Sequence, residues 1–460
     1  MVAAQQRDPV VVVGASMAGL LAARALVEQG VPVTVIDRDD LPLAATPRAR
    51  VPQGRQLHIL LSAGLEQLRA WFPGIEEELQ HQGAARVDGF GAWIHQGGAY
   101  RARGELGRPG LSLTRPLLEQ VVRERVAALP GVSIEAGATV ERVEVTGHRV
   151  TGVVVDGRVR ATELVVDASG RSSRIARGLA RDGVLDPPVT HVGIDIGYVS
   201  FFLRRSAGDF EGDVAIVIGN PGTFRSGAAL PVERDRWNVM LSGVHGDAPP
   251  STAEGVAAFA RSLSSPTIAQ LIEHCPRVSD IESYRFPSSR RRHYERVADL
   301  PGGLVTIGDA ACSFDPVYGQ GMTSAAQQAA ALGRAVTRVG LGAPDLPKRF
   351  HRHAARIIDA PWRIAVGGDF GHPETVGPRP LGTKRLNGYT VRMIQAAHAS
   401  LPVARVFNRV LQLEDPPMVL FRPDVVARVL TASRRSPVVT GVAVQHPRVG
   451  PPTQCPELPH

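Results

Sequence analysis

The feature that most constrains the fold is a strand–helix–strand pattern at the start of the chain. Val10–Val13 are four consecutive valines that end at Gly14, and apolar residues at helical spacing follow Ser16. Such a β-branched run is typical of a buried parallel strand. Gly30 then precedes a second apolar run that ends at Asp37. Two parallel strands joined by a helix belong to a sheet covered by helices, so the pattern predicts an α/β fold.

The turn around Gly14 is typical of a dinucleotide-binding site. A helix N-terminus offers free N–H groups and the positive end of its dipole to a pyrophosphate. Gly14 permits the tight turn, Gly19 permits close packing of helix on strand, and Asp37 suits a ribose hydroxyl. Ser16 replaces the usual middle glycine, and the alternative interpretation is a plain α/β crossover. The residues predicted to bind a dinucleotide are Gly14, Ser16, Met17, Ala18, Gly19, Asp37 and Arg38.

A second segment, residues 304–322, favours FAD as the dinucleotide. An apolar strand leads to Asp309, and a loop with proline and two glycines precedes an alanine-rich helix from about Met322. An acid at a strand end suits a chain of hydroxyl groups, and a glycine turn at a helix start offers N–H groups to an electron-rich ring edge. No second strand–helix–strand pattern with a glycine turn follows Gly170, so a permanently bound NAD(P)H domain is not expected.

Residues 304–322 resemble the Gly-Asp motif of the class A flavoprotein monooxygenases. The resemblance implies one non-covalently bound FAD, with Asp309 on its ribityl chain and Tyr318 beside its ring. The other residues of this segment that it places along the flavin are Pro316, Gly319, Gln320, Gly321 and Met322.

Further segments resemble other parts of the same enzymes. Residues 164–174 resemble the family's Asp-Gly motif, with Ser169 in place of its acid. Residues 48–58 resemble a segment that runs past the flavin, where His58 is equally well a structural histidine. Arg115 stands at a helix start where the family has a flavin-contacting arginine. The resemblance therefore adds the cofactor-binding candidates Gln53, Arg55, Arg115, Val140 (an adenine contact), Asp167, Ala168 and Gly170.

Because these signals are spread along the chain, the resemblance implies a discontinuous, Rossmann-like FAD-binding domain of the p-hydroxybenzoate hydroxylase type. Strand-like segments between the signals suggest a β-sheet substrate domain that covers the flavin, and C-terminal helices follow. The expected ranges are 8–75, 100–185 and 286–345 for the FAD-binding domain, 76–99 and 186–285 for the substrate domain, 346–435 for the C-terminal helices and 436–460 for a flexible tail.

Several stretches, including residues 299–322 and 361–380, resemble the actinobacterial flavin-dependent epoxidases of polyether polyketide biosynthesis, relatives of squalene epoxidase. The resemblance implies transfer of one oxygen atom from O2, through a flavin C4a-hydroperoxide, to C=C bonds of a polyene or polyketide in antibiotic biosynthesis. NAD(P)H or a partner flavin reductase would supply the electrons, and the apolar substrate is free or carrier-bound. No catalytic side chain is nominated, because the flavin carries the chemistry. Phe201, Phe202 and Trp237 are substrate candidates together with Tyr318, unless the first three belong to the core.

Three alternatives stay open. An aromatic hydroxylase of the same family needs a base or relay, for which His191, Asp195 and Tyr198 are available. A flavin reductase of isoprenoid double bonds, or an FAD-stabilised binding protein, would use the same fold without oxygen.

Composition excludes other classes. Lys+Arg (52) exceed Asp+Glu (44), but no long basic run with interleaved aromatics occurs, so nucleic acid is not an expected partner. Three widely spaced cysteines argue against disulfides and a metal site and fit a reducing cytosol. No run of about 18 apolar residues occurs, so a cytoplasmic protein without a transmembrane segment is expected.

Overall fold

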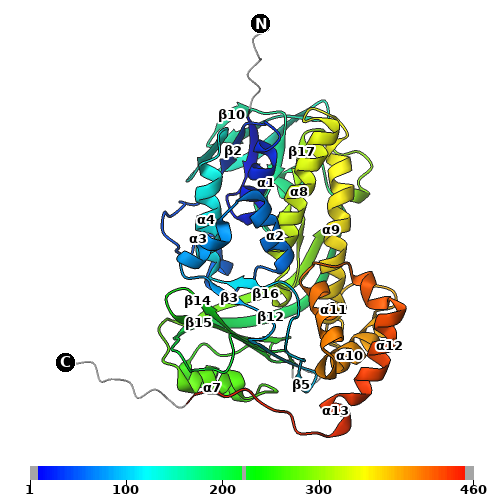
Figure 1. Cartoon of the computed structure of the whole chain (residues 1–460). Helices are drawn as coiled ribbons and strands as arrows, with labels where there is room; N and C mark the ends of the chain where they lie inside the picture. The colour runs from blue at the N-terminus through cyan, green and yellow to red at the C-terminus, as the bar shows by residue number, and fades with distance from the viewer. Residues whose placement is uncertain (1–8, 220–223, 451–460) are drawn as a thin grey trace, which may run out of the picture.

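The computed structural model describes residues 9–219 and 224–450 (Figure 1). Residues 1–8, and residues 451–460 at the end of the expected flexible tail, lie outside the described residues. No described helix is long and apolar enough to cross a membrane.

A five-stranded parallel sheet forms one half of the molecule, as the valine run predicts. Its strand order is β17-β11-β1-β2-β7, and every neighbouring pair is parallel. The strands are β1 (Val10–Val13), β2 (Val33–Ile36), β7 (Val132–Glu135), β11 (Val165–Asp167) and β17 (Leu304–Thr306).

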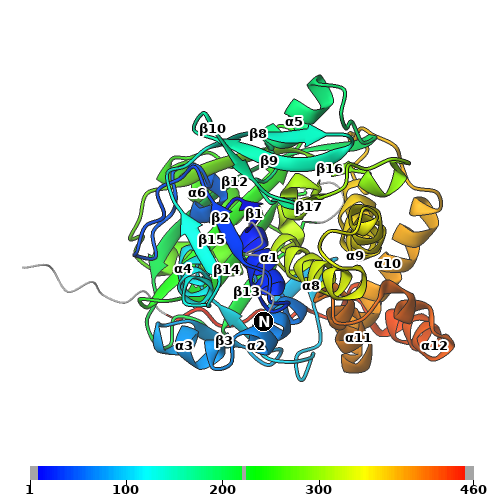
Figure 2. The ribbon, with the colours of Figure 1, turned by 90° about the horizontal axis from the view of Figure 1, so that it is seen from above.

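The two faces of this sheet bury different partners. Val10 and Val12 belong to a core shared with helices, whereas Val11 and Val13 belong to a second core shared with β8 and β9. Figure 2 shows α1, α4 and α8 on one side of the sheet and the strands β8 to β10 on the other. The helices and strands that pack around this sheet are α1 (Met17–Val27), α2 (Ser62–Trp71), α3 (Ile75–His81), α4 (Arg115–Ala127), α5 (Arg174–Arg181), α8 (Gly321–Val339), β8 (Val140–Thr146), β9 (Arg149–Val155) and β10 (Arg158–Ala161).

A mixed eight-stranded sheet forms the other half, in the order β18-β16-β12-β15-β14-β13-β4-β5. One face packs against α6 (Ala253–Arg261) and α7 (Thr267–His274). The strands are β4 (Ala92–Gln96), β5 (Ala99–Tyr100), β12 (Val189–Arg204), β13 (Val214–Val217), β14 (Ser226–Val232), β15 (Arg236–Val244), β16 (Glu282–Arg292) and β18 (Cys312–Ser313); β3 (Ala85–Val87) and β6 (Gly110–Ser112) form a separate pair.

The C-terminal helices complete the fold. They are α9 (Leu346–Asp369), α10 (Thr383–Ala399), α11 (Leu401–Leu411), α12 (Pro423–Ala432) and α13 (Pro437–Thr440). The architecture is the α/β fold that the sequence predicts, with a parallel sheet, a second large sheet and C-terminal helices. The exact domain boundaries stay a prediction; β16 runs through the expected boundary at 286, and β18 lies inside a range expected for the FAD-binding domain.

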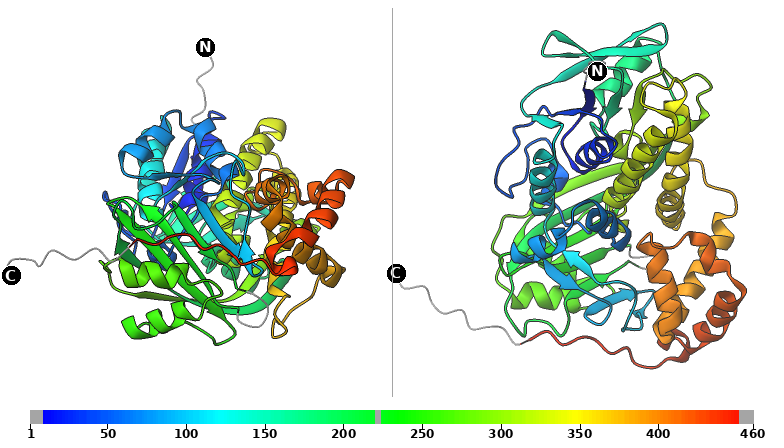
Figure 3. Two further views of the ribbon diagram at one scale, coloured as in Figure 1. Left: turned by 60° about the horizontal axis from the view of Figure 1, so that its bottom comes forward. Right: turned by 45° about the horizontal axis from the view of Figure 1, so that its top comes forward.

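The expected flexible tail is held in place up to residue 450. Beyond α13 the chain runs toward α7 (Figure 1), along the lower edge of the molecule in the right-hand view of Figure 3. The backbone N–H of Glu211 donates to Arg448 O at 2.9 Å, and that of Gly450 donates to Asp209 O at 3.0 Å. Backbone hydrogen bonds therefore hold residues 448–450 of the expected flexible tail against the rest of the molecule.

Candidate functional site

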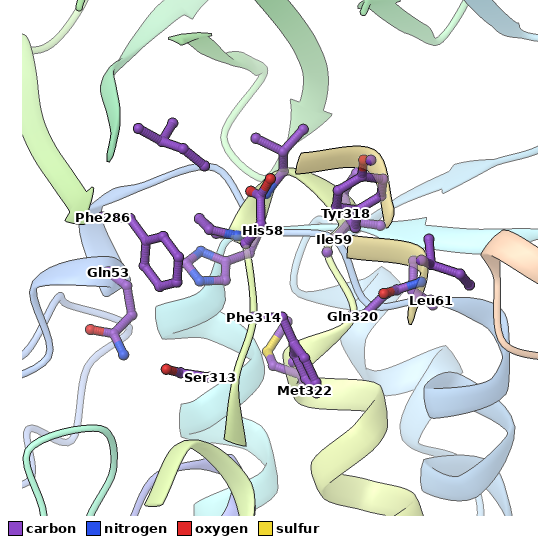
Figure 4. Close-up of a pocket in the computed structure, with 18 of the residues that line it drawn as sticks. Gln53, His58, Ile59, Leu61, Phe286, Ser313, Phe314, Tyr318, Gln320 and Met322 are labelled. Carbon is purple, nitrogen blue, oxygen red and sulfur yellow. The ribbon is translucent and has the colours of Figure 1, made fainter. Parts of the chain in front are cut away.

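A cavity of about 1250 Å³ is lined by the carboxyl ends of the parallel strands, one face of the eight-stranded sheet and α10. Ligand pockets usually measure about 300–1000 Å³. The cavity is therefore large enough for more than one small molecule. Figure 4 shows part of its wall, where Gln53 and His58 lie opposite Tyr318 and Gln320.

The first glycine turn has the geometry that its sequence predicts. Gly14 has φ +106°, and a Cβ there would lie 2.7 Å from Ala168 O, so only glycine fits. Its N–H donates to Ile36 O at 2.8 Å. A Cβ at Gly19 would lie 1.8 Å from Gly14 O, so Gly19 serves the packing of α1 on β1 and does not line the cavity. Of the predicted dinucleotide-binding residues, Gly14, Ser16, Met17, Ala18, Asp37 and Arg38 line it.

Asp37 is held by protein donors at the end of β2. Its Oδ2 accepts from Ala15 N at 2.6 Å and from Arg48 at 3.1 Å, and its Oδ1 accepts from Asp39 N at 2.8 Å. The buried Arg48 was not among the predicted site residues, although it lies in the segment that resembles the flavin-lining loop.

Ser16 replaces a glycine because it has partners of its own. Its hydroxyl donates to Glu119 at 2.5 Å and accepts from Arg115 at 2.9 Å, while Arg115 Nε donates to Glu119 at 2.8 Å. Burial alone would raise the pKa of Glu119, but Arg115 and Arg48 outweigh it and lower that pKa. Glu119, which sequence reasoning missed, thus orients Arg115 at the cavity; its place one helical turn after Arg115 was the available signal.

His58 is a neutral hydrogen-bonding group. Burial, and then the nearby Arg115, lower the pKa of His58 to about 3. Its Nε2 accepts from Arg115 at 3.2 Å, and its Nδ1 donates to Gln56 O at 2.9 Å, an assignment that follows from these partners.

The Asp-Gly segment needs one correction. Asp167 does not line the cavity: it is fully buried and accepts from Ser169 N at 3.1 Å, from the Ser169 hydroxyl at 2.5 Å and from the Ser173 hydroxyl at 2.6 Å. Burial raises the pKa of Asp167. Asp167 therefore positions the loop, whose residues Ala168, Ser169 and Gly170 line the cavity.

The flavin-type loop forms the opposite wall. Asp309, in the short helix η3 (Gly308–Ala310), faces the cavity, and burial raises the pKa of Asp309 while Arg115 and Arg171 oppose that rise. Pro316, Tyr318, Gly319, Gln320, Gly321 and Met322 all line the cavity. Gln320 precedes α8 and is 1% exposed, and neither atom of its amide has a partner among the described residues.

These features fit FAD. A buried amide without a partner costs free energy unless a ligand satisfies it. The first turns of α1 and α8 both offer free N–H groups to this cavity, which suits a pyrophosphate and a flavin ring edge. Gln53, Arg115 and Val140 also line the cavity. Arg55 does not: it is largely exposed and forms an ion pair with Glu282 at 2.8 Å, so its predicted cofactor contact is replaced by a surface pair.

Of the four expected substrate residues, Tyr318 lines the cavity, whereas Phe201, Phe202 and Trp237 do not. Phe201 and Trp237 are 2% and 1% exposed and belong to the core beneath α6 and α7. Phe202 lies toward the end of β12, where the Arg236 guanidinium sits 4.3 Å from its ring centroid. Side chains alternate between the two faces of a sheet, so the cavity is lined by residues on the face opposite to Phe201 and Trp237. These residues include Ile194, Ile196, Tyr198, Met240, Val244 and Phe286.

The three candidates for an acid–base role lie apart. Asp195 forms an ion pair with Arg285 at 2.6 Å, and His191 is exposed. Tyr198 lines the cavity with its ring centroid 5.3 Å from that of Tyr284, and burial holds the pKa of Tyr198 well above its ordinary value.

A pair of buried carboxyl groups on the cavity wall was not predicted. Asp315 precedes the short helix η4 (Pro316–Tyr318), Asp369 ends α9, and the two are 6% and 2% exposed. Burial raises the pKa of Asp315 to about 6, and burial together with Asp315 raises that of Asp369 well above its ordinary value. Asp369 therefore keeps a proton that it shares with Asp315.

Comparison with known proteins points to the same cofactor. Residues 7–360 match the model of the family described as FAD binding domain. Protein Rv3254 of Mycobacterium tuberculosis is 30% identical over 462 residues, which cover 94% of this chain and 98% of that protein. The 6-hydroxynicotinate 3-monooxygenase of Bordetella bronchiseptica is 29% identical over 286 residues, 58% of this chain and 70% of that enzyme.

A solved structure shows the same fold. PqsL of Pseudomonas aeruginosa, a probable FAD-dependent monooxygenase, has a TM-score of 0.64 at 17% identity, with 83% of this chain and 99% of that chain covered. The chain therefore belongs to the FAD binding domain family of FAD-dependent monooxygenases.

Proposed function

We propose that this monooxygenase transfers one oxygen atom of O2 to a C=C bond of an apolar polyene or polyketide. One observation carries the proposal: among the described residues, no charged side chain and no histidine of the eight-stranded sheet's strands lines the cavity. Epoxidation of an alkene needs no protein base, whereas hydroxylation of a phenol is helped by one. An apolar wall also excludes water from the reacting atoms.

The residues of the chain hold and orient the reactants. Asp37, Arg115 and Asp309, with the first turns of α1 and α8, would hold FAD along its length. When bound, FAD supplies the transfer of electrons to O2, and NAD(P)H or a partner flavin reductase supplies those electrons. Ile196, Met240 and the other apolar residues of the sheet position the substrate.

A second candidate is hydroxylation of an aromatic ring. Tyr198 and Tyr284 bring two phenol groups to the cavity wall, and these groups are suited to hydrogen bonding a ring substituent. Both stay protonated near neutral pH, because burial raises the pKa of each.

Turnover with isotopically labelled O2 tests the proposal. Purified holoprotein receives NADPH, a flavin reductase and either a lipophilic polyene or a phenol. The expected product is the polyene carrying one labelled oxygen atom as an epoxide. Label in the phenol alone would assign the second candidate, and a polyene that gains hydrogen without label would assign a reductase.

A further inference from the structure

One end of the cavity opens beside a stretch of chain without acidic residues. Residues 376–413 contain six Lys+Arg and no Asp or Glu. Arg405 and Arg409 are paired with acids outside this stretch. The other four, Arg379, Lys384, Arg385 and Arg392, are exposed, and none forms an ion pair with a described residue.

Exposed apolar side chains lie at the same end of the cavity. Leu386 and Val391 of α10 are 41% and 50% exposed, and Met418 and Phe421 of the short helix η5 (Pro417–Phe421) are 71% and 42% exposed. All four also line the cavity, so they form its mouth. Leu381, just before α10, is completely exposed. We call these five residues the rim.

The rim is preformed. The Tyr389 ring stacks on Phe421 with centroids 5.2 Å apart, and its hydroxyl donates to Leu420 O at 2.7 Å. Asn387 donates to Gly367 O at 2.9 Å, which ties α10 to α9. The two parts of the rim are therefore held together at the lower right of the molecule in Figure 1, beside α10 and α12.

Grouped exposed apolar side chains mark an interaction surface, and cations beside them select an anionic partner. A second copy docked symmetrically would place the same four cations face to face, which opposes self-association. Leu381 and Met418 project into solvent, which suits insertion into a fluid interface. Arg422 and Asp424, which follow the rim in the sequence, have opposite charges, so the net charge around the rim stays positive.

We propose that the rim docks on the surface of an anionic lipid bilayer. The rim residues enter the boundary between headgroups and acyl chains, and the four cations contact lipid phosphates. The cavity then opens toward the bilayer, and, given the proposed function, its apolar substrate passes from the lipid into the site. Docking itself does not depend on the reaction, so it is tested without turnover.

Co-sedimentation of holoprotein with vesicles tests the proposal. Phosphatidylcholine vesicles with and without phosphatidylglycerol are compared at low and high salt. We expect binding that requires phosphatidylglycerol and weakens with salt, because the contacts of the cations are screened. Each of the two substitutions in K384E/R385E should weaken vesicle binding about fivefold or more. The double variant R158E/R177E, in exposed positions on β10 and α5, is the control with the same net charge.

A second pair of variants tests the apolar part. L381S/M418S should weaken vesicle binding about tenfold or more, whereas L43S, at a position 89% exposed, should not change it. Bound FAD and far-UV dichroism check that each variant is folded. Absence of phosphatidylglycerol-dependent binding, or equal loss in test and control variants, would overturn the proposal. So would a lipid-free dimer that L381S/M418S abolishes, or an acidic carrier protein that binds the rim where vesicles do not.

Discussion

At the scale of single residues, the carboxyl pair Asp315 and Asp369 links ionisation to stability. In the unfolded chain both groups lose their protons near their ordinary pKa, whereas burial raises both pKa values in the folded protein. The folded state then binds more protons than the unfolded state above about pH 4, so stability falls as pH rises. The fall due to Asp315 is complete once pH exceeds its folded pKa of about 6.

Asp369→Asn should therefore flatten this dependence. The amide still donates to Asp315 but carries no charge, so the loss of stability between pH 4 and 7, on the order of 1–3 kcal/mol, should shrink. Urea unfolding across this pH range measures the change. Asp424→Asn, at an exposed position on α12, is the control and should leave the slope as in the parent protein.

Asp309 is the residue on which the ribityl assignment depends. Asp309→Ala removes the carboxylate that faces the cavity and should yield protein with FAD bound at least tenfold more weakly, because charge-assisted hydrogen bonds contribute about 1.5–3 kcal/mol. Fluorescence titration of stripped protein with FAD gives the Kd. Glu141→Ala on the exposed part of β8 is the control. Stoichiometric yellow cofactor in the purified Asp309→Ala protein would contradict the assignment.

At the scale of elements, β12 shows where sequence patterning stops being decisive. The segment is apolar on both faces, because one face packs on α6 and α7 and the other lines the cavity. Ile194, Ile196 and Tyr198 line the cavity, whereas Val199, Phe201 and Leu203 belong to the core. Both sets are apolar or aromatic, so the sequence predicted the strand but left open whether Phe201 faces the substrate or the core. The first glycine turn, by contrast, was predictable because its signals are local.

Substitutions on the two faces of the sheet should separate stability from substrate binding. Phe201→Leu should lower the free energy of unfolding by about 1–2 kcal/mol and leave KM unchanged, because Phe201 touches only the core. Met240→Ala, on the cavity face, should cost less stability and change KM. Urea unfolding and steady-state turnover measure the two effects. The reverse outcome would mean that the substrate binds on the helix-covered face.

At the scale of the whole molecule, the cofactor site joins segments that are far apart in the chain. Its lining comes from β1 and α1, from α4, from the loop after β11 and from the start of α8. A ligand that bridges these segments binds only the folded state, so it stabilises all of them together.

Removal of FAD should therefore lower Tm. At FAD concentrations 100-fold above Kd, the free energy of unfolding should rise by about 2.7 kcal/mol relative to stripped protein. Calorimetry of stripped and reconstituted protein measures this. Riboflavin is the control, because it lacks the adenosine and pyrophosphate that the α1 turn would hold. Equal stabilisation by riboflavin would mean that the Gly14 turn does not bind the cofactor.

The sequence by itself determined the elements whose signals are local: the strand–glycine–helix turn at Gly14, the acid at the end of β2, and the loop from Asp309 to Met322 that borders the cavity. Only the tertiary structure decided that Asp167 turns away from the cavity, that Arg55 pairs at the surface and that Asp315 meets Asp369. The reason is physical. Backbone conformation follows from neighbouring residues, whereas the direction of a side chain depends on how the folded segments pack. Its partners can then lie close in the chain, as Ser173 does for Asp167, or far away, as Glu282 does for Arg55.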